Sequence, residues 1–236
     1  MQLFFSDHIK AGIIQLKEEE ARHCAQVLRK QTGDVIQVVD GRGNWYEAEL
    51  LDCSKKACQA KILSEKAVDQ KRDYRIHIGI APTKNISRLE WFLGKATEIG
   101  IDEITPLLCQ RSERKIIRND RLEKILLAAM KQSLKATLPN LYSLTRFEDF
   151  VRSLDAFKGQ KYIAYCEESV NITLRKNYRA GQDVCILIGP EGDFTAEEVK
   201  LAQSAGFEAL SLGASRLRTE TAGVIACHTI HLLNEK

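Results

Sequence analysis

The sequence lacks several features that would assign it to a functional class at once. No apolar run approaches the ~18 residues needed to span a bilayer, and Met1–His8 has neither the basic region nor the apolar stretch of a signal peptide. The seven cysteines include no CxxC pair, and the five histidines show no HExxH spacing, so we expect no metal site. Scattered cysteines in odd number favour reduced thiols over a disulfide framework. We therefore expect a cytoplasmic protein that binds neither metal nor membrane.

A large excess of charge of one sign is also absent. The 236 residues include 35 basic and 32 acidic side chains, for a net charge of +3, so binding to nucleic acid would need local basic patches. Apolar residues make up 44% and charged residues 28%, which is typical of a soluble globular protein. The length allows one large domain or two modest ones.

Residues 1–70 are rich in short strand patterns separated by turns. The Asp40–Gly43 stretch is a strong turn signal, and Lys17–Lys30 has the apolar spacing of a helix. The expected strands are Val35–Val39, Trp45–Leu51 and Ala57–Leu63. These patterns predict a small β-barrel domain, followed by a polar linker over Glu65–Arg72.

Residues 71–236 alternate between strand and helix patterns, which predicts an α/β domain with a parallel sheet covered by helices. The expected strands are Arg75–Ala81, Glu103–Leu108, Tyr162–Tyr165, Val184–Ile188 and Glu208–Leu212. The expected helices are Ser87–Ile99, Asp120–Lys135, Thr195–Ala205 and Glu220–Leu233. In such sheets, ligands bind beyond the carboxyl ends of the strands.

One such strand end carries the stretch Gly189-Pro190-Glu191-Gly192, followed by a helix whose Thr195 and Glu198 have capping-box spacing. The bend offers free backbone N–H groups, but it has neither the Lys-Ser/Thr pair of a P-loop nor GxGxxG spacing. Asp193 would also repel a phosphate. A neutral or cationic ligand fits this bend better, and a plain structural turn explains it equally well.

A second bend, Leu212–Ala222, leads from a strand into the last helix. Gly213 permits close approach to the backbone. Capping by Thr219 and an exposed Arg218–Glu220 ion pair would account for part of the bend. They do not account for two arginines at a helix N-terminus, where the helix dipole disfavours positive charge. We therefore expect those arginines to have a partner elsewhere.

The two bends together resemble a known family. "LIGPEGDFTAEE" and "LGASRLRTETA" are similar to the signature of the RsmE family, ribosomal RNA small-subunit (16S) methyltransferases of the SPOUT superfamily that act on N3 of a uridine. "HCAQVLRKQTGDVIQVVDGRG", "APTKNISRLEWFLGKATEIGIDEITPL" and "AAMKQSLKATLP" extend the resemblance over the whole chain. Two departures stand out: Asp193 occupies a place where glycine is common, and Met130-Lys131 replaces a common acidic pairing.

The resemblance implies a PUA-like RNA-binding barrel in residues 1–70 and a SPOUT domain with a C-terminal trefoil knot in residues 71–236. It also implies a homodimer, to which the last helix contributes. S-adenosylmethionine would be held by the two bends and by a third loop after Tyr165. The residues carried over to this role are Tyr165, Ile188, Gly189, Pro190, Glu191, Gly192, Leu212, Gly213, Leu217, Thr221 and Ala222.

Methylation of uracil N3 requires loss of a proton and stabilisation of negative charge on the ring oxygens. Arg218 is the candidate to stabilise this negative charge. Glu220 is the candidate base that removes the proton, and Glu191 is a second candidate base. Small-subunit rRNA would be bound by basic residues of both domains, through phosphates and an unstacked base. The RNA-binding candidates are Arg22, Arg29, Lys84, Arg88, Arg111, Arg114 and Lys115, with Lys30, Arg42, Arg118 and Arg121 nearby in sequence.

Alternatives remain at this point. A solvated loop is the common fate of a basic run such as 111–121, and Trp45 and Trp91 lie in apolar patterns typical of core residues rather than of stacking platforms. A non-catalytic RNA-binding protein or a 2′-O-ribose methyltransferase would share the fold. A nucleotide-dependent enzyme or an unknotted methyltransferase is disfavoured, because "IGIAPTKNIS" has no glycine-rich loop.

Overall fold

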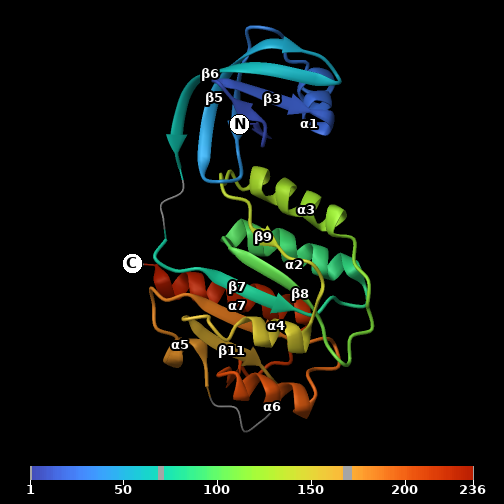
Figure 1. Ribbon diagram of the computed structural model, residues 1–236, viewed down its shortest axis with the longest axis vertical. Helices are drawn as coiled ribbons and strands as arrows, with labels where there is room; N and C mark the ends of the chain where they lie inside the picture. Colours follow the sequence, from blue (N-terminus) through green and yellow to red (C-terminus); the bar gives the residue numbers. More distant parts are fainter. Residues whose placement is uncertain (1, 69–71, 167–171, 236) are drawn as a thin grey trace. The chain divides into compact units, whose positions relative to one another are not determined.

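The computed structural model describes residues 2–68, 72–166 and 172–235. The chain forms two compact units (Figure 1). The first unit contains residues 1–71 and 127–138, and the second contains residues 72–126 and 139–236. Helix α3, Asn119–Gln132, therefore contributes its first residues to the second unit and its last residues to the first.

The first unit is built on a six-stranded sheet that curls around one core. The strand order is β1-β4-β5-β6-β3-β2, and all neighbours are antiparallel except the β1–β4 pair. Inward side chains of five of these strands, Phe4 and Leu16 among them, meet in a single apolar cluster with Cys24 of the helical segment. The elements are β1 (Leu3–Phe5), β2 (Ile9–Lys10), β3 (Ile13–Lys17), α1 (Glu18–Arg22), a π-helical turn η1 (His23–Val27), β4 (Val35–Val39), β5 (Asn44–Cys53) and β6 (Ala57–Ala67).

Two expectations for this unit need correction. The helix expected over Lys17–Lys30 stops being α-helical at Arg22 and continues as the π-turn, after which Arg29 adopts a positive φ of 53° that ends the helical path. The expected linker over Glu65–Arg72 is in part a strand, because β6 stays paired with β5 as far as Ala67. This end of β6 is exposed and therefore carries polar side chains, which is why the sequence pattern indicated a linker there. Residues 69–71 of the expected linker lie outside the described residues.

The expectation that all cysteines are reduced is also wrong. Cys53 and Cys58 are joined by a disulfide, with Cα atoms 4.0 Å apart. They face each other where β5 ends and β6 begins, so the hairpin register places the two sulfurs together. The sulfur of Cys24 lies within 4.8 Å of both.

A second cluster in the first unit explains the Met130-Lys131 departure. Met130 and Ala136 are buried against Leu3, Val39 and Trp45. Lys131 forms an ion pair with Glu20. Met130 and Lys131 therefore both have structural roles within this unit. The expectation that Trp45 is a core residue is confirmed, since Trp45 is only 6% exposed.

The second unit contains a parallel sheet, as the alternating pattern predicts. The strand order is β10-β8-β7-β12-β11-β13, with β9 also paired to β8, and every recorded pair is parallel. Its strands are β7 (Ile76–Ile80), β8 (Glu103–Leu108), β9 (Asn140–Leu141), β10 (Thr145–Arg146), β11 (Gln160–Ala164), β12 (Val184–Ile188) and β13 (Glu208–Leu210). Besides α3, its helices are α2 (Ile86–Ile99), α4 (Phe147–Ser153), α5 (Leu174–Asn177), α6 (Ala196–Ser204) and α7 (Thr219–Asn234).

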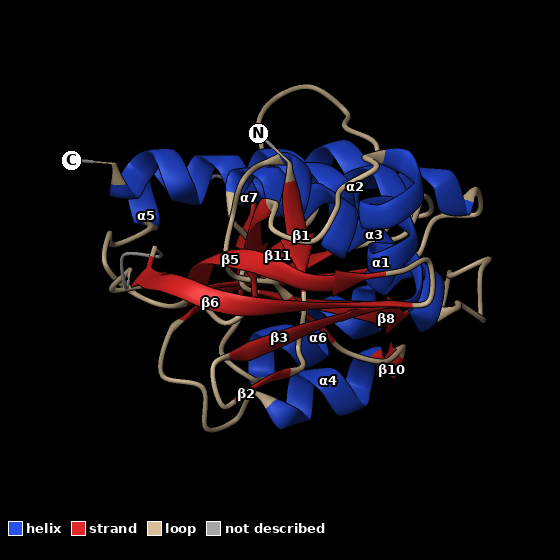
Figure 2. Cartoon of the chain, turned by 90° about the horizontal axis from the view of Figure 1, so that it is seen from above, coloured by secondary structure: helices blue, strands red, loops and turns tan. Residues whose placement is uncertain are grey.

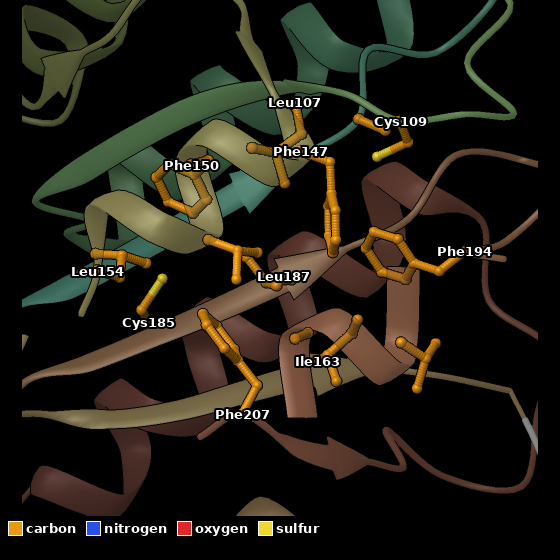
Figure 3. Close-up of a cluster of buried hydrophobic side chains, with 14 residues drawn as sticks. Leu107, Cys109, Phe147, Phe150, Leu154, Ile163, Cys185, Leu187, Phe194 and Phe207 are labelled. Atoms are coloured by element: carbon orange, nitrogen blue, oxygen red, sulfur yellow. The ribbon is translucent and has the colours of Figure 1, made fainter. Parts of the chain in front are cut away.

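Helices cover both faces of this sheet (Figure 2). α2 and α7 pack together over one face, while α4 and α6 pack together over the other. On the α4–α6 face, Phe147 and Phe150 lie with Phe194, Phe207 and Leu187 in one buried apolar cluster (Figure 3). The sheet is thus held from both sides, and its loops at the carboxyl ends of the strands are free to build a site.

No helix within residues 2–68, 72–166 and 172–235 combines the length and the apolarity needed to cross a membrane.

Candidate functional site

The two glycine-containing bends lie side by side. Thr219, at the start of α7, donates a hydrogen bond from Oγ1 to the carbonyl oxygen of Gly189, at 3.0 Å. Gly189 follows β12 directly, and the second bend begins just after β13. The hydroxyl of Thr219 therefore ties one bend to the other. It does not cap its helix: Arg218 occupies the N-cap position, and no side chain provides a cap bond there.

A third loop joins them through Asp193. The Asp193 carboxylate accepts a hydrogen bond from the backbone N–H of Cys166 at 3.3 Å and another from Phe194 at 2.8 Å. Tyr165, just before Cys166, donates its backbone N–H to the carbonyl of Leu210 at 3.1 Å. Loops following β11, β12 and β13 therefore meet at one edge of the sheet. Residues 167–171 of the third loop lie outside the described residues.

Asp193 adopts a φ of +60°, a left-handed conformation that glycine reaches without strain. Asp193 adopts a strained backbone conformation, and its side chain makes a hydrogen bond to the third loop. This departure thus strengthens the link between the loops instead of breaking it.

The bends form an open cradle. Gly213 has a φ of +120°, and a Cβ atom placed on it would meet no atom within 4 Å. At Gly189 the same Cβ would stand 3.1 Å from the ring of Phe194. The first position leaves room for a ligand against the backbone, and the second needs glycine for close packing. Such a cradle fits a ligand that is recognised largely through backbone atoms.

Two arginines of the basic run connect further loops at this edge. Arg111 donates to the carbonyl oxygen of Gly192 at 2.7 Å, and Arg114 donates to those of Thr83 and Lys84 at 3.1 and 2.6 Å. Because carbonyl oxygens are neutral, the guanidinium charges stay uncompensated by these bonds. Both charges therefore remain available to a phosphate.

Other members of the run are paired with acidic groups. Arg118 pairs with Asp120 at 2.8 Å, and Arg121 pairs with Glu90 at 2.6 Å. Lys84, from the loop after β7, is paired with Glu113 at 2.9 Å. The Arg118–Asp120 and Lys84–Glu113 pairs are exposed, so they are weak and give way to phosphate at little cost.

A cavity of about 530 Å³ opens beside the second bend. It is lined by α2 on one side and by the bend and the start of α7 on the other. The lining residues are Ser87, Arg88, Trp91, Arg216, Leu217, Arg218, Glu220 and Thr221. Trp91 is 48% exposed here, so the expectation that it is a core residue is wrong. The buried face of α2 consists of Leu89, Phe92, Leu93 and Ala96, and Trp91 lies off that stripe.

Glu220 is the unusual group of this cavity. It is only 7% exposed, and its Oε2 atom is buried without a hydrogen-bond partner. Its Oε1 atom lies 3.8 Å from Nε of Arg88, so the ion pair expected with Arg218 forms with Arg88 instead. Arg218 is exposed at the mouth of the cavity. An unpartnered buried carboxylate oxygen is costly, so this atom is a candidate contact for a ligand group.

The structure brings most of the expected site residues of the second unit to the same edge of its sheet. The residues from Ile188 to Gly192 and from Leu212 to Ala222 form the two joined bends, and Tyr165 belongs to the loop that Asp193 ties to them. Among the RNA-binding candidates, Lys84, Arg111, Arg114 and Lys115 belong to loops at that edge, and Arg88 lines the cavity. Arg22 and Arg29 are exposed on the first unit. Their contacts with cofactor or RNA stay predictions.

Comparison with known proteins identifies the fold and family. The family model described as "RNA methyltransferase domain" matches residues 70–231, and the model described as "RNA methyltransferase PUA domain" matches residues 16–63. The chain belongs to the RNA methyltransferase family.

Relatives of this RNA methyltransferase extend over its full length. "Ribosomal RNA small subunit methyltransferase E" of Synechocystis is 28% identical over 236 residues, covering 97% of this chain and 76% of the relative. A crystal structure of a protein of Porphyromonas gingivalis named a probable rRNA-methyltransferase is 41% identical, with a TM-score of 0.90 and coverage of 99% and 98% of the two chains. The ribosomal RNA small subunit methyltransferase E of Neisseria gonorrhoeae, solved bound to S-adenosyl methionine, is 26% identical with a TM-score of 0.86 and coverage of 99% and 98%.

These matches confirm the expected fold class, an α/β SPOUT domain preceded by a PUA-like domain. They also confirm that the chain is a methyltransferase. The threading of the C-terminal bends into a trefoil knot stays a prediction.

Proposed function

We propose that this methyltransferase transfers a methyl group from S-adenosylmethionine to N3 of a uridine in small-subunit ribosomal RNA. The observation that carries the proposal is the hydrogen bond from Thr219 to Gly189, which joins the two signature bends beside a buried carboxylate. The full-length likeness to proteins named ribosomal RNA small subunit methyltransferase E supports the choice of RNA.

The cradle suits the cofactor. The open backbone at Gly213 and the tight corner at Gly189 would hold a flat base and a polar tail mainly through N–H and C=O groups. Leu217 and Thr221 face the neighbouring cavity, so the reactive end would lie next to it. When bound, the cofactor supplies a sulfonium methyl group that is already activated for transfer, so the chain itself has to prepare the acceptor nitrogen.

Two side chains of the cavity match that requirement. Glu220 presents a carboxylate oxygen without a partner, which is placed to accept the proton of a uracil N3. Arg218 lines the same cavity and would stabilise the negative charge that then spreads over the ring oxygens. Glu191 is less suited to act as a base, because its carboxylate already accepts the backbone N–H of Lys84 at 2.9 Å and its side chain is exposed.

The proposal extends to assembly and location. The family resemblance implies a homodimer to which the last helix contributes, and α7 carries an exposed Leu232 that a second copy would cover. We therefore propose a homodimer, to be tested by light scattering of the purified chain. A substrate in the small ribosomal subunit would place the protein in the bacterial cytoplasm.

The test uses small subunits from a strain that lacks the gene. Purified protein and cofactor with a labelled methyl group are incubated with these subunits and, separately, with naked small-subunit rRNA. Digestion to nucleosides and mass spectrometry identify the product. We expect N3-methyluridine at one position, where reverse transcriptase stops because the methyl group blocks pairing.

The same experiment separates the alternatives. A ribose-methylated nucleoside would assign the protein to 2′-O methylation. Absence of any methylated product, together with tight RNA binding and no calorimetric signal for the cofactor, would indicate a non-catalytic RNA-binding protein.

A further inference from the structure

We propose that the cavity between α2 and the second bend is the binding site for the unstacked target base, and that Trp91 is the platform on which this base stacks. The inference rests on the proposed function and adds two things to it: which residue holds the base, and how uracil is distinguished from other bases.

The position of Trp91 supports a binding role. A tryptophan that is 48% exposed is costly on a surface, and α2 fulfils its packing needs with Leu89, Phe92, Leu93 and Ala96. Trp91 instead lines a cavity together with Leu217 and with polar side chains such as those of Arg88 and Glu220. An aromatic face with polar groups at its edge is the usual arrangement for a splayed-out base, since stacking holds the ring while hydrogen bonds read its edge.

The Oε2 atom of Glu220 would accept the hydrogen bond from the edge of the stacked base. An ionised carboxylate only accepts hydrogen bonds, so the unpartnered oxygen requires a donor. Uracil carries a donor at N3. Cytosine presents an acceptor at that atom, and N3-methyluracil presents a methyl group. The same oxygen would therefore select uracil, reject cytosine and release the methylated product.

Arg88 positions the carboxylate. Its Nε atom lies 3.8 Å from Oε1 of Glu220, within the range of an ion pair but too far for a hydrogen bond. Arg88 and Trp91 are three residues apart on α2, so both project from neighbouring positions of one helix. Helix α2 thus carries both the stacking residue, Trp91, and Arg88, which is the ion-pair partner of Glu220.

The charge of the cavity mouth suits a nucleotide. Arg216 and Arg218 are exposed there; Arg216 would meet a phosphate that flanks the extruded base, while Arg218 would contact the ring oxygens of the base. A volume of about 530 Å³ lies in the range of small-ligand sites, which is roughly 300–1,000 Å³. Uracil and the methyl-donating end of the cofactor can therefore both enter.

The test uses tryptophan fluorescence, which does not depend on turnover. In the full-length Trp45→Phe variant, Trp91 is the single tryptophan. This variant, saturated with S-adenosylhomocysteine, is titrated with three short oligoadenylates that contain one central uridine, cytidine or N3-methyluridine. We expect the uridine oligonucleotide to quench Trp91 emission, and to bind at least about tenfold more tightly than the other two. Equal affinity for all three, or no quenching by any of them, would overturn the inference.

Substitutions then separate stacking from structure. Trp91→Ala should weaken binding of the uridine oligonucleotide about tenfold or more, and Trp91→Phe should restore part of the loss. Glu220→Gln, whose side-chain amide can donate as well as accept a hydrogen bond, should abolish the preference for uridine over cytidine. If Trp91→Ala instead lowers the molecular mass in light scattering and leaves oligonucleotide affinity unchanged, Trp91 belongs to a subunit interface and the inference fails.

Failure of the proposed function would look different. A wild-type enzyme that forms N3-methyluridine while Trp91→Ala retains full kcat/KM would refute the role of Trp91 alone. A wild-type enzyme that methylates another atom would refute the proposed function, whatever the fluorescence titration shows.

Discussion

Gly223 of α7 lies against the ring of Phe92 on α2, so closely that a Cβ atom on Gly223 would stand 2.6 Å from a ring carbon. The two helices that frame the base-binding cavity therefore meet where one of them has no side chain. Gly223→Ala should push α7 away from α2 and lower the free energy of unfolding by about 1–3 kcal/mol. Urea denaturation measures this change.

Gly94→Ala on α2 is the matched control, because a Cβ atom there would meet nothing within 4 Å. It should raise stability by about 0.5–1 kcal/mol through helix propensity. Equal effects of the two substitutions would show that the α2–α7 contact is not tight.

Thr219→Val removes the hydroxyl that joins the two bends and keeps the side-chain shape. Since one such hydrogen bond contributes about 0.5–1.5 kcal/mol, we expect the dissociation constant for S-adenosylmethionine to rise about two- to tenfold in calorimetry. Thr229→Val, on the same helix but away from the bends, should leave it unchanged. Unaltered affinity in the Thr219 variant would show that the hydrogen bond between the two bends does not contribute to cofactor binding.

Arg218→Ala should abolish most methyl transfer while the protein stays folded. Loss of a donor aimed at a developing anion lowers kcat by about 10²–10³-fold. The measurement is single-turnover transfer to small subunits, with circular dichroism as the check on folding. Arg175→Ala, an exposed arginine on α5, serves as the comparison and should retain wild-type activity. Full activity of the Arg218 variant would remove this residue from the mechanism.

His77 makes stability depend on pH. Burial, with the charge of Arg75 in second place, lowers the pKa of His77 to about 4. Glu103 lies 3.4 Å from Nδ1 and favours the charged form, but removal of the ring from water outweighs it. His77 is neutral in the folded chain, while an unfolded chain binds the proton below pH 6.5. Its stabilising contribution is therefore complete above pH 6.5 and is lost as the pH falls towards 4, to a total of about 3 kcal/mol.

Urea unfolding at pH 7 and at pH 5 checks this window. His77→Gln should lose less stability between the two pH values than the wild type does. The exposed His228 offers the control, and His228→Gln should keep the wild-type difference. An identical difference in all three proteins would contradict the role of His77.

Elements with a long, regular pattern could be predicted from the sequence. The helix expected over Ser87–Ile99 matches α2 to within one residue at its start, and the capping box of Thr195 and Glu198 is present as expected. The short strands β1, β2, β9 and β10 were not predicted, because two to three residues carry no measurable period. Helix α4 follows β10 directly and has no capping side chain, so nothing local marks its start.

The site could be predicted only in part. The two bends were recognisable from their residues, but their contact through Thr219 is set by the order of strands in the sheet, which no local pattern encodes. Trp91 was misjudged because it stands among apolar residues, although the spacing of Leu89, Phe92, Leu93 and Ala96 places it off the buried stripe. The ion-pair partner of Glu220, Arg88, is more than a hundred residues away in sequence, so no local pattern could indicate it.

The contribution of residues 127–138 to the first unit affects how that unit can be isolated. A fragment that stops at Lys71 would lack Met130 and Ala136, and it would leave Leu3, Val39 and Trp45 without the side chains that cover them. Such a fragment should aggregate when produced alone. Supplying the missing dozen residues as a synthetic peptide, or splicing them onto the truncated end, would make the PUA-like half a split protein whose reassembly could be followed by the emission of Trp45.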